Sequence, residues 1–543
     1  MRIDEVAVGR GLSGGGPPWL GRMSRREFLR AGATVGIGVG SIGPLLAACS
    51  KKSSSSTPSG KPRTGGDLIF ARAADPASVD PSPVFDNEAI WLCLNMYDCL
   101  YSVTPDGHGS QPWLAVSHEL SSDQLTWSFT LRPGVKFSDG SPLTAADVQF
   151  SLERAAKGPN GYILAAVDDI QAPSSSQIVI HTKHPWGPLL GDLSLYSNGI
   201  LPKDLGGATA QQFFEHPVGT GPFKFDSWTK GQQLKLVKNP YYWQEGKPYL
   251  DSVTFTVVPD DNTRVLQLRG GQANVIEFPP YSAVSSLQSS PGLSVDLFPS
   301  TLVGYIRMNE KKPQFADVHV RRAICYATDR ESIVSSVLFG HGETANSFFS
   351  PSWNFYDKNA PSLAYDLATA KQELAISAFP NGFAAEFAII AGDTVNSAIA
   401  QIVQANLKVL NIDLTIRSDD LSAHNALLHH FEYDMAADYY TLDIGDPDEN
   451  APWCVDPVRG GTDSLYTNYT NQYVIQWGIA AERTIDPKQR AELYTKMQET
   501  VAQEAAFVEL YYAPYIYAHQ TKLGGWTVYP TGNYHLEEAW LAS

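Results

Sequence analysis

Residues 125–151, LTWSFTLRPGVKFSDGSPLTAADVQFS, constrain the fold of this chain more than any other stretch of comparable length. Apolar residues alternate with Thr126, Ser128 and Thr130, and this period of two predicts a strand with one buried face. Arg132-Pro133-Gly134 supplies a fixed φ followed by a permissive residue. We therefore expect a turn there, with Val135 and Phe137 returning as a second short strand.

The end of the same stretch predicts a helix. Thr144 is followed three residues later by Asp147, the spacing of a capping box at a helix start. Apolar residues then recur at helical spacing, at Ala145, Val148, Leu152 and Ala155. The unit therefore reads as hairpin, turn and amphipathic helix.

This string resembles the signature of family 5 of the extracellular solute-binding proteins, the receptors of peptide, and of some nickel and oligosaccharide, ABC importers. The matching positions are Trp127, Phe129, Leu131, Arg132, Gly134, Val135, Lys136, Phe137, Asp139, Gly140, Thr144, Ala145, Asp147, Val148, Phe150 and Ser151. So many fixed positions in one unbroken stretch make the resemblance specific.

Further motifs extend the resemblance over most of residues 66–540. They are Tyr97-Asp98-x-Leu100, Val218-Gly219-Thr220-Gly221-Pro222-Phe223, Asn239-Pro240-Tyr241-Tyr242-Trp243, Gly304-Tyr305-Ile306-x-Met308-Asn309 and the helix from Val320 to Arg330. The first of them lies on a helix expected from Asn87 to about Leu100. Val508 to Tyr512 resembles the strand with which the family returns to its first lobe.

The resemblance implies an α/β, two-lobed, periplasmic-binding-protein-like fold of the class with an extra domain, its lobes joined by a hinge that the chain crosses twice. Transferred to this sequence, the base of the first lobe takes residues 66–98, 195–300 and 513–543. The extra domain takes 99–194 and the second lobe 301–512. A ligand binds between the lobes, which close around it by a hinge motion, and a membrane permease then receives it.

The N-terminus reads as an export signal over residues 1–48. Arg25 and Arg26 lie in a twin-arginine-like motif ahead of a short, uncharged, weakly apolar segment. Leu46-Ala47-Ala48-Cys49 resembles a bacterial lipobox, which implies a lipid on Cys49, and residues 49–65 form a serine-rich flexible linker. The expected location is extracytoplasmic, tethered to the outer face of the cell membrane. Met23 is an alternative start.

Charge and cysteine content exclude some classes of partner. A formal charge of −17 repels phosphate backbones, so nucleic acid is not expected as a partner. Five cysteines include no Cys-x-x-Cys pair, so neither structural zinc nor a redox motif is indicated. The pairing of Cys93, Cys99, Cys325 and Cys454 stays open.

Asp443 is the first candidate for ligand binding. Residues 440–448, YTLDIGDPD, are similar to the stretch in which an aspartate of peptide-binding members pairs with the α-amino group of the peptide. A buried ammonium needs a charged partner. The alternative is that Asp443, like its neighbours Asp446 and Asp448, is a turn residue beside Pro447. We favour binding for Asp443 and the turn role for Asp446 and Asp448.

Aromatic residues are the other candidates for the site. Tyr440 stands where peptide-binding members usually have a tryptophan that lines a side-chain pocket, and an aromatic wall offers apolar area with a polar tip. Tyr439, Trp453 and Tyr305 are further pocket candidates. No arginine can be assigned to a ligand carboxylate from the sequence.

No cofactor and no metal site is expected. His424, His429 and His430 with Glu432 invite a metal interpretation, but a cluster at the exposed end of an amphipathic helix (residues 421–431) is more often solvated, and no second cluster closes a site.

The leading hypothesis is a lipid-anchored, monomeric receptor of an ABC importer that binds di- or oligopeptides and has no enzymatic activity. One alternative keeps the receptor and changes the ligand to an oligosaccharide or a metal chelate. Another is a secreted hydrolase, although the mature sequence shows neither a nucleophile elbow nor a His-Glu-x-x-His motif.

Overall fold

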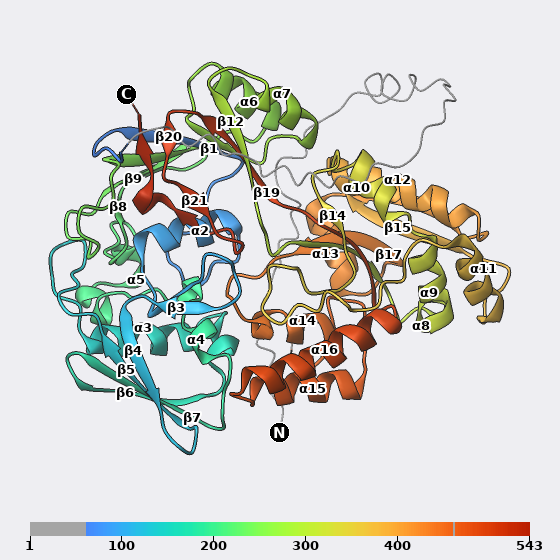
Figure 1. Cartoon of the computed structure of the whole chain (residues 1–543), viewed down its shortest axis with the longest axis horizontal. Helices are drawn as coiled ribbons and strands as arrows, with labels where there is room; N and C mark the ends of the chain where they lie inside the picture. Colours follow the sequence, from blue (N-terminus) through green and yellow to red (C-terminus); the bar gives the residue numbers. More distant parts are fainter. Residues whose placement is uncertain (1–60, 460–461, 543) are drawn as a thin grey trace, which may run out of the picture.

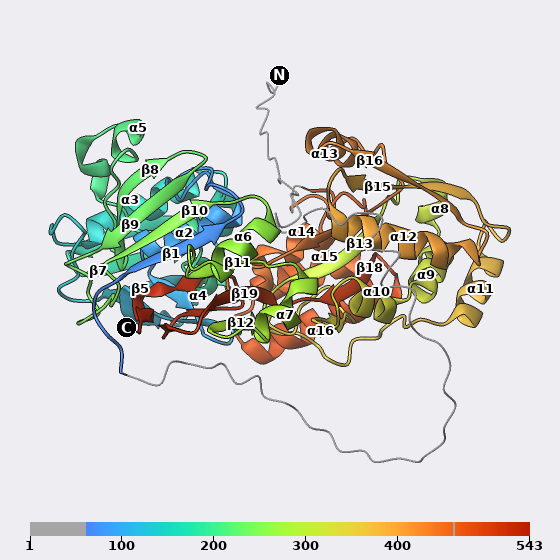
Figure 2. The ribbon, with the colours of Figure 1, turned by 90° about the horizontal axis from the view of Figure 1, so that it is seen from above.

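Two α/β lobes lie side by side in the computed structural model, which describes residues 61–459 and 462–542 (Figures 1 and 2). Each lobe is built on one large sheet, and a smaller sheet extends the first lobe at the lower left of Figure 1. The expected two-lobed α/β fold is confirmed. Among the described residues, no helix has both the length and the apolar character needed to cross a bilayer.

The first lobe is organised around a seven-stranded mixed sheet. In spatial order its strands are β12 (Leu293–Phe298), β19 (Tyr515–Gln520), β11 (Val275–Glu277), β1 (Asp67–Arg72), β10 (Ser252–Val257), β9 (Gln233–Lys238) and β8 (Phe223–Thr229). The central strand β1 runs parallel to both of its neighbours and is apolar at Leu68, Phe70 and Ala71, which are fully buried. Helices of this lobe are α2 (Asn87–Met96), α5 (Ala210–Phe213), α6 (Asp261–Arg269) and α7 (Val284–Gln288).

The second lobe contains a six-stranded sheet. Its strands, in spatial order, are β14 (Glu343–Thr344), β18 (Phe507–Tyr512), β13 (Val303–Met308), β17 (Met435–Tyr440), β15 (Ala384–Ile390) and β16 (Asp413–Asp419). Nine α-helices of the described residues accompany it: α8 (Pro313–Ala316), α9 (Val318–Ala327), α10 (Arg330–Ser336), α11 (Leu367–Ile376), α12 (Thr394–Lys408), α13 (Leu421–His429), α14 (Ala451–Val455), α15 (Gln472–Glu482) and α16 (Pro487–Gln503).

A four-stranded antiparallel sheet and its helices include residues 125–151. Its strands are β4 (Ala115–Leu120), β5 (Thr126–Leu131), β7 (Gln177–Thr182) and β6 (Val167–Ser174), and α3 (Ala145–Ala156) and α4 (Leu189–Asp192) accompany them. The predicted strand and helix are confirmed as β5 and α3, and Thr144 with Asp147 forms the capping box. Three two-stranded ladders complete the fold: β2 (Tyr101–Val103) with β3 (Ser110–Pro112), β20 (Leu523–Gly524) with β23 (Trp540–Leu541), and β21 (Thr527–Val528) with β22 (Tyr534–His535).

The predicted second strand of the hairpin is wrong. Both edges of β5 are occupied, by β4 and by β7, so Val135 and Phe137 have no free edge to pair with. The segment makes a single bridge, between Lys136 and Pro142, and buries its two apolar side chains in the core of this sheet. Val135 and Phe137 therefore alternate with polar residues because both pack into the core beneath a loop, and not because the segment is a strand.

Two other predicted elements differ at their ends. Helix α2 stops at Met96, because Tyr97 is already extended, so the YD-x-L motif follows the helix. Strand β18 pairs with β13 in the sheet of the second lobe, and the chain returns to the first lobe only after it, over residues 513–514. The first crossing is also short, over the four residues 299–302 between β12 and β13. The Ser300 hydroxyl donates to the carbonyl oxygen of Ala513, which ties the two crossings together.

Four of the motifs shared with the family meet at the buried carboxylate of Asp98. The indole N–H of Trp113 donates to Oδ1 at 2.7 Å, and that of Trp243 donates to Oδ2 at 3.1 Å. Thr220 Oγ1 accepts from the backbone N–H of Asp98, and the guanidinium of Arg132 lies 4.1 Å from the ring centre of Trp243. The signature therefore holds the extra domain to the base of the first lobe. It does so away from the space between the lobes.

Removing one indole donor should destabilise the fold in a pH-dependent way. Burial raises the pKa of Asp98 to about 6, against the two indole hydrogen bonds, which favour its ionised form. Trp113→Phe leaves one buried oxygen unpaired, and we expect a loss of about 1 to 3 kcal/mol in the free energy of unfolding at pH 8. The loss should shrink at pH 5, where the folded protein holds Asp98 protonated and less dependent on donors.

The measurement is chemical denaturation at both pH values. Trp477→Phe is the matched control, because Trp477 is half-buried and its indole nitrogen has no hydrogen-bond partner among the described residues. Equal losses at pH 5 and pH 8 would show that the effect comes from ring packing alone.

Candidate ligand-binding site

A cavity of about 410 Å³ lies between the two lobes. The first lobe contributes the start of α2, part of the extra domain and the start of β19. The second lobe contributes β13, the end of β17 and the loop that follows β17. All five residues expected in the site border this cavity, namely Tyr305, Tyr439, Tyr440, Asp443 and Trp453. Its size falls within the range of roughly 300 to 1,000 Å³ that is usual for small-molecule sites.

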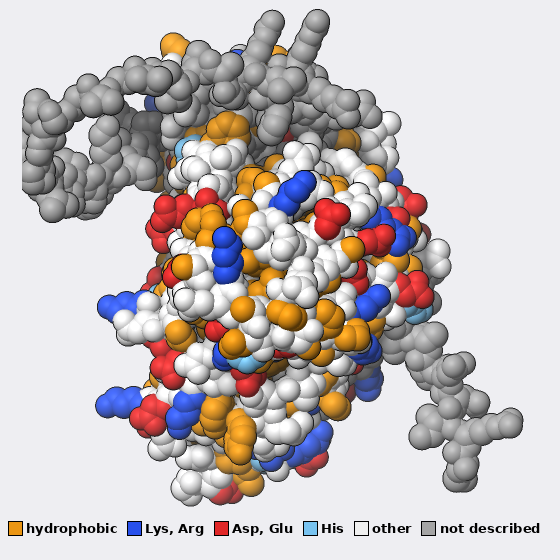
Figure 3. Space-filling model, turned by 90° about the vertical axis from the view of Figure 1, so that its right-hand side faces the viewer, with side chains coloured by type: hydrophobic (Ala, Val, Ile, Leu, Met, Phe, Trp, Pro, Cys, Tyr) orange, Lys and Arg blue, Asp and Glu red, His pale blue; other side chains and the backbone are white. Residues whose placement is uncertain are grey.

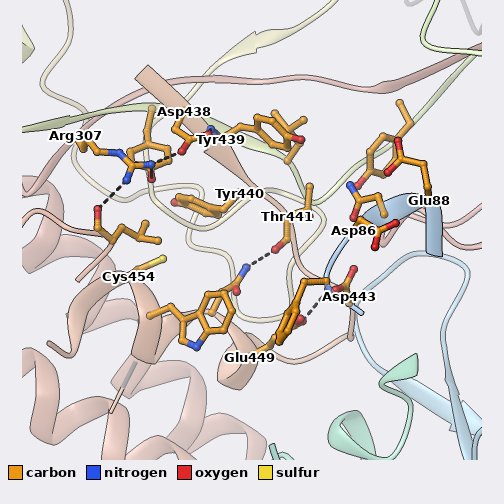
Figure 4. Close-up of a pocket in the computed structure, with 18 of the residues that line it drawn as sticks. Asp86, Glu88, Arg307, Asp438, Tyr439, Tyr440, Thr441, Asp443, Glu449 and Cys454 are labelled. Carbon is orange, nitrogen blue, oxygen red and sulfur yellow. Dashed lines mark hydrogen bonds and ion pairs between the residues drawn. The ribbon is translucent and has the colours of Figure 1, made fainter. Parts of the chain in front are cut away.

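Asp443 lies on the loop after β17 and is held from behind by Glu449. One carboxylate oxygen of Glu449 accepts hydrogen bonds from the backbone N–H groups of Asp443, at 2.7 Å, and Ile444, at 3.2 Å (Figure 4). Oδ1 of Asp443 is buried and has no hydrogen-bond partner. Burial raises the pKa of Asp443 to about 7 and raises that of Glu449 as well, further increased by the charge of Asp443. The loop thus holds Asp443 against the cavity with one carboxylate oxygen unpaired, while its side chain also interacts with Glu449.

Tyr440 and Tyr305 form an apolar wall. Their ring centres lie 5.1 Å apart, and Trp353 packs behind Tyr440. The Tyr440 hydroxyl donates to the carbonyl oxygen of Phe348 at 2.6 Å, and the Tyr305 hydroxyl accepts from Arg307 at 2.8 Å. Both hydroxyl groups are therefore hydrogen-bonded to protein groups, and the aromatic rings supply the wall.

Trp453 and Tyr439 occupy other parts of the boundary. The ring of Trp453 lies 5.7 Å from that of Tyr162, which belongs to the short helix η1 (Gly161–Leu164) of the extra domain. This pair joins the second lobe to the first at the cavity edge. Tyr439 stands near the end of β17, and its backbone N–H donates to Asp438.

Asp446 and Asp448 are absent from the cavity boundary. Asp446 makes a bidentate ion pair with Arg490, at 2.6 and 2.8 Å, and also accepts from the backbone N–H of Asp448 as a turn residue does. Both are buried where the extra domain meets the second lobe, close to Asp192. Their role is structural.

The structure adds charged residues that the sequence analysis missed: Asp86, Glu88, Arg307, Asp438 and Glu449. Arg307 on β13 forms an ion pair with Asp438 on the neighbouring strand β17, two positions along from the residue that directly faces it, Ala436. Arg307 occupies the variable position of the motif Gly304-Tyr305-Ile306-x-Met308-Asn309, so the motif did not mark it. Asp86 and Glu88 come from a loop and helix far away in the sequence, and nothing local marks them.

The histidines of the predicted cluster lie in different environments. His424 is buried, so the expectation that it is solvated is wrong, whereas the ring of His429 stacks on that of Tyr466 at 4.9 Å. No group of three metal-ligating side chains occurs in the described part of the chain. Cys93, Cys99, Cys325 and Cys454 are all buried and unpaired.

The lobes touch each other around the cavity. The backbone N–H of Gly187 in the extra domain donates to the carbonyl oxygen of Glu482 at 2.7 Å. Gly445, beside the Asp443 loop, meets the backbone of Gly109, so that a Cβ on Gly445 would lie 2.3 Å from the Gly109 carbonyl oxygen. The lobes are therefore in a closed arrangement.

Comparisons with known proteins agree with this architecture. Residues 110–461 match the family described as bacterial extracellular solute-binding proteins, family 5. The oligopeptide-binding protein AppA of Bacillus subtilis (strain 168) is 31% identical over 532 residues, covering 92% of this chain and 96% of AppA. The chain belongs to family 5 of the bacterial extracellular solute-binding proteins, as its motifs had indicated.

Two solved structures are similar over nearly the same length. Periplasmic binding protein DppA from Helicobacter pylori, in complex with the peptide STSA, has a TM-score of 0.77 and 29% identity, covering 89% of this chain and 99% of that one. AppA from Bacillus subtilis in complex with a nonapeptide has a TM-score of 0.76 and 28% identity, covering 89% of this chain and 100% of that one.

The residues predicted for export and lipid attachment, Arg25, Arg26 and Cys49, lie outside the described residues.

Proposed function

We propose that this chain captures short peptides that carry a free amino terminus, in the cavity between its lobes, and presents them to an ABC importer. The observation that supports this most directly is the buried, unpartnered Oδ1 of Asp443 against a closed cavity. A peptide ammonium would satisfy that oxygen with a charge-assisted hydrogen bond. Tyr440, Tyr305, Tyr439 and Trp453 would then surround the ligand with aromatic surface.

The charge of the cavity favours a peptide over an uncharged sugar. Asp443, Glu449 and Glu88 all border it, and a neutral oligosaccharide would leave these carboxylates buried without a counter-charge. Two relatives of this fold, DppA and AppA, were solved with peptides bound. These observations support a peptide over the alternative of an oligosaccharide or a metal chelate.

The remaining parts of the proposal concern location and partners. Residues 1–48 would direct twin-arginine export through Arg25 and Arg26, Cys49 would carry the lipid, and residues 49–65 would tether a monomeric body outside the membrane. A permease would accept the peptide without chemical change to it. Hydrolysis of any peptide by the purified protein would instead favour the alternative of a secreted hydrolase.

Asp443→Asn should weaken peptide binding by about tenfold to a hundredfold, because a hydrogen bond to a charged group contributes about 1.5 to 3 kcal/mol. The measurement is calorimetry with a tripeptide library, each member in free and N-acetylated form. Acetylated peptides should bind the wild type as poorly as free peptides bind the variant. Asp413→Asn, at an exposed position, is the control. Equal affinity for free and acetylated peptides would remove Asp443 from this role.

The same interaction predicts how affinity changes with pH. Since burial raises the pKa of Asp443 to about 7, the empty closed site holds a proton at lower pH and must lose it to bind an ammonium. Affinity should fall by up to about tenfold per pH unit below pH 7, and should be nearly flat from pH 7 to the pKa of the peptide amine, about 8. Calorimetry from pH 5 to 8 measures this slope, and Asp443→Asn should remove most of it. An affinity that rises toward pH 5 would contradict the assignment.

Gly445→Ala should weaken binding without unfolding the protein. Its Cβ would lie 2.3 Å from the Gly109 carbonyl oxygen, so the closed arrangement is blocked while each lobe keeps its own packing. We expect at least about a tenfold loss of affinity, since ligand and closure are coupled. The matched control is Gly109→Ala, whose Cβ would meet nothing within 4 Å. Solution scattering with saturating peptide should show a larger radius of gyration for Gly445→Ala than for the control; identical profiles and affinities would refute the coupling.

A further inference from the structure

The side chains around the cavity carry an unbalanced charge. Among the described residues that border it, one is a lysine or arginine, Arg307, whereas five are carboxylates: Asp86, Glu88, Asp438, Asp443 and Glu449. The outer face of the second lobe differs, because acidic and basic side chains are interspersed there (Figure 3). The excess of acidic side chains is thus specific to the cavity between the lobes. Buried like charges repel strongly where water is excluded.

The one arginine does not offset that excess. Its guanidinium donates to Asp438, to the Tyr305 hydroxyl at 2.8 Å and to the carbonyl oxygen of Leu465 at 3.3 Å. Arg307 and Asp438 therefore balance each other at one end of the cavity, opposite the end where Asp86 and Glu88 lie (Figure 4). Four carboxylates remain.

Three of these four already have defined partners or a proposed one. Asp86 caps α2 by accepting from the backbone N–H of Ala89 at 2.9 Å. Glu449 accepts from the backbone of the Asp443 loop, and Asp443 is assigned to the ligand amino group. The carboxylate of Glu88 lies in the first turn of α2 at the cavity boundary, and it has no ion pair and no hydrogen bond to the side chain of another described residue.

The nearest cation is committed elsewhere. Arg72 is fully buried, pairs with Glu277 at 3.3 Å and donates to the backbone carbonyl oxygen of Glu88 at 2.8 Å. It therefore fixes the position of Glu88 without bonding its carboxylate. Burial raises the pKa of Glu88 to about 7; the charge of Glu277 raises it further, whereas Arg72 lowers it. Glu88 is thus held in place at the cavity boundary and has no ion-pair partner among the described residues.

We propose that Glu88 is a second cation-binding carboxylate, and that the site selects short peptides carrying a positive side chain in addition to the amino terminus. This rests on the proposed function, in which Asp443 receives the terminal ammonium. Glu88 belongs to the first lobe and Asp443 to the second, so a dicationic ligand joins the two lobes by its two charges. Closure around such a ligand replaces repulsion between carboxylates by two charge-assisted contacts.

The test compares lysine with norleucine, which has the same chain length without the ammonium. Tripeptides of alanine with lysine or norleucine at position 1, 2 or 3 are titrated into the protein by calorimetry at pH 7.5. In the wild type, we expect at least one lysine peptide to bind about tenfold or more tightly than its norleucine counterpart. In Glu88→Gln this ratio should fall below about threefold, while the norleucine peptides keep their wild-type affinity.

Two controls separate charge from structure. Glu215→Gln removes an exposed glutamate far from the cavity and should leave the ratio unchanged. Glu88→Asp keeps the negative charge on a side chain that is one methylene shorter. It should retain part of the preference for lysine over norleucine peptides. Equal binding of lysine and norleucine peptides by the wild type at all three positions, or a preference that survives in Glu88→Gln, would overturn the inference.

A diamine distinguishes the failure of this inference from failure of the proposed function. If no tripeptide binds, the proposed peptide function fails, and 1,5-diaminopentane then probes the two carboxylates alone. Binding of the diamine that weakens at least about tenfold in Glu88→Gln would support Glu88 as a cation site. Absence of diamine binding, or equal binding by wild type and Glu88→Gln, would overturn it.

Discussion

A carboxylate removed from water needs a donor or a cation, and this requirement organises the whole molecule. Asp98 meets it with two indole N–H groups, Glu277 with Arg72, and Asp446 with Arg490. These satisfied acids hold the base, the extra domain and the second lobe together. At the cavity between the lobes, Asp443 keeps one buried oxygen without a partner, and Glu88 forms no ion pair with any described residue. The first group of acids stabilises the scaffold, whereas Asp443 and Glu88 lie where a ligand in the cavity would meet them.

Sequence patterns correctly predicted those elements that are specified by residues close together in the sequence. The alternation in residues 126–131 and the capping box at Thr144 specify β5 and α3 by themselves, and both are present. The segment 135–137 has the same alternation but forms no strand, because the pairing partners of β5 come from residues 115–120 and 177–182. The end of α2 was likewise predicted too late, since the extended backbone at Tyr97 precedes the buried anchor at Asp98. Strand pairing and the hydrogen bonds of a buried residue such as Asp98 depend on residues that are distant in the sequence. The periodicity of a short segment contains no information about them.

The site was predictable where it lies on one continuous stretch. Tyr439, Tyr440, Asp443 and Trp453 lie within fifteen residues of one another, from the end of β17 to α14, and all four border the cavity. Glu88 and Arg307 enter from other strands and helices, and only the assembled lobes bring them to the same space. His424 shows the converse error, because a polar residue on an amphipathic helix was expected in water and is buried. The motifs that identified the family describe its scaffold better than its ligand, since they meet at Asp98.

The two crossings between the lobes are short and are bonded to each other through Ser300 and Ala513. With both connections tied at one point, relative motion of the lobes is confined to swinging about that axis, and sliding or twisting apart would break the tie. Release of a solute held between the lobes is then coupled to that swing. Its residence time is then governed by how often the hinge opens, so any membrane partner that grips both lobes could set the rate of unloading without touching the solute.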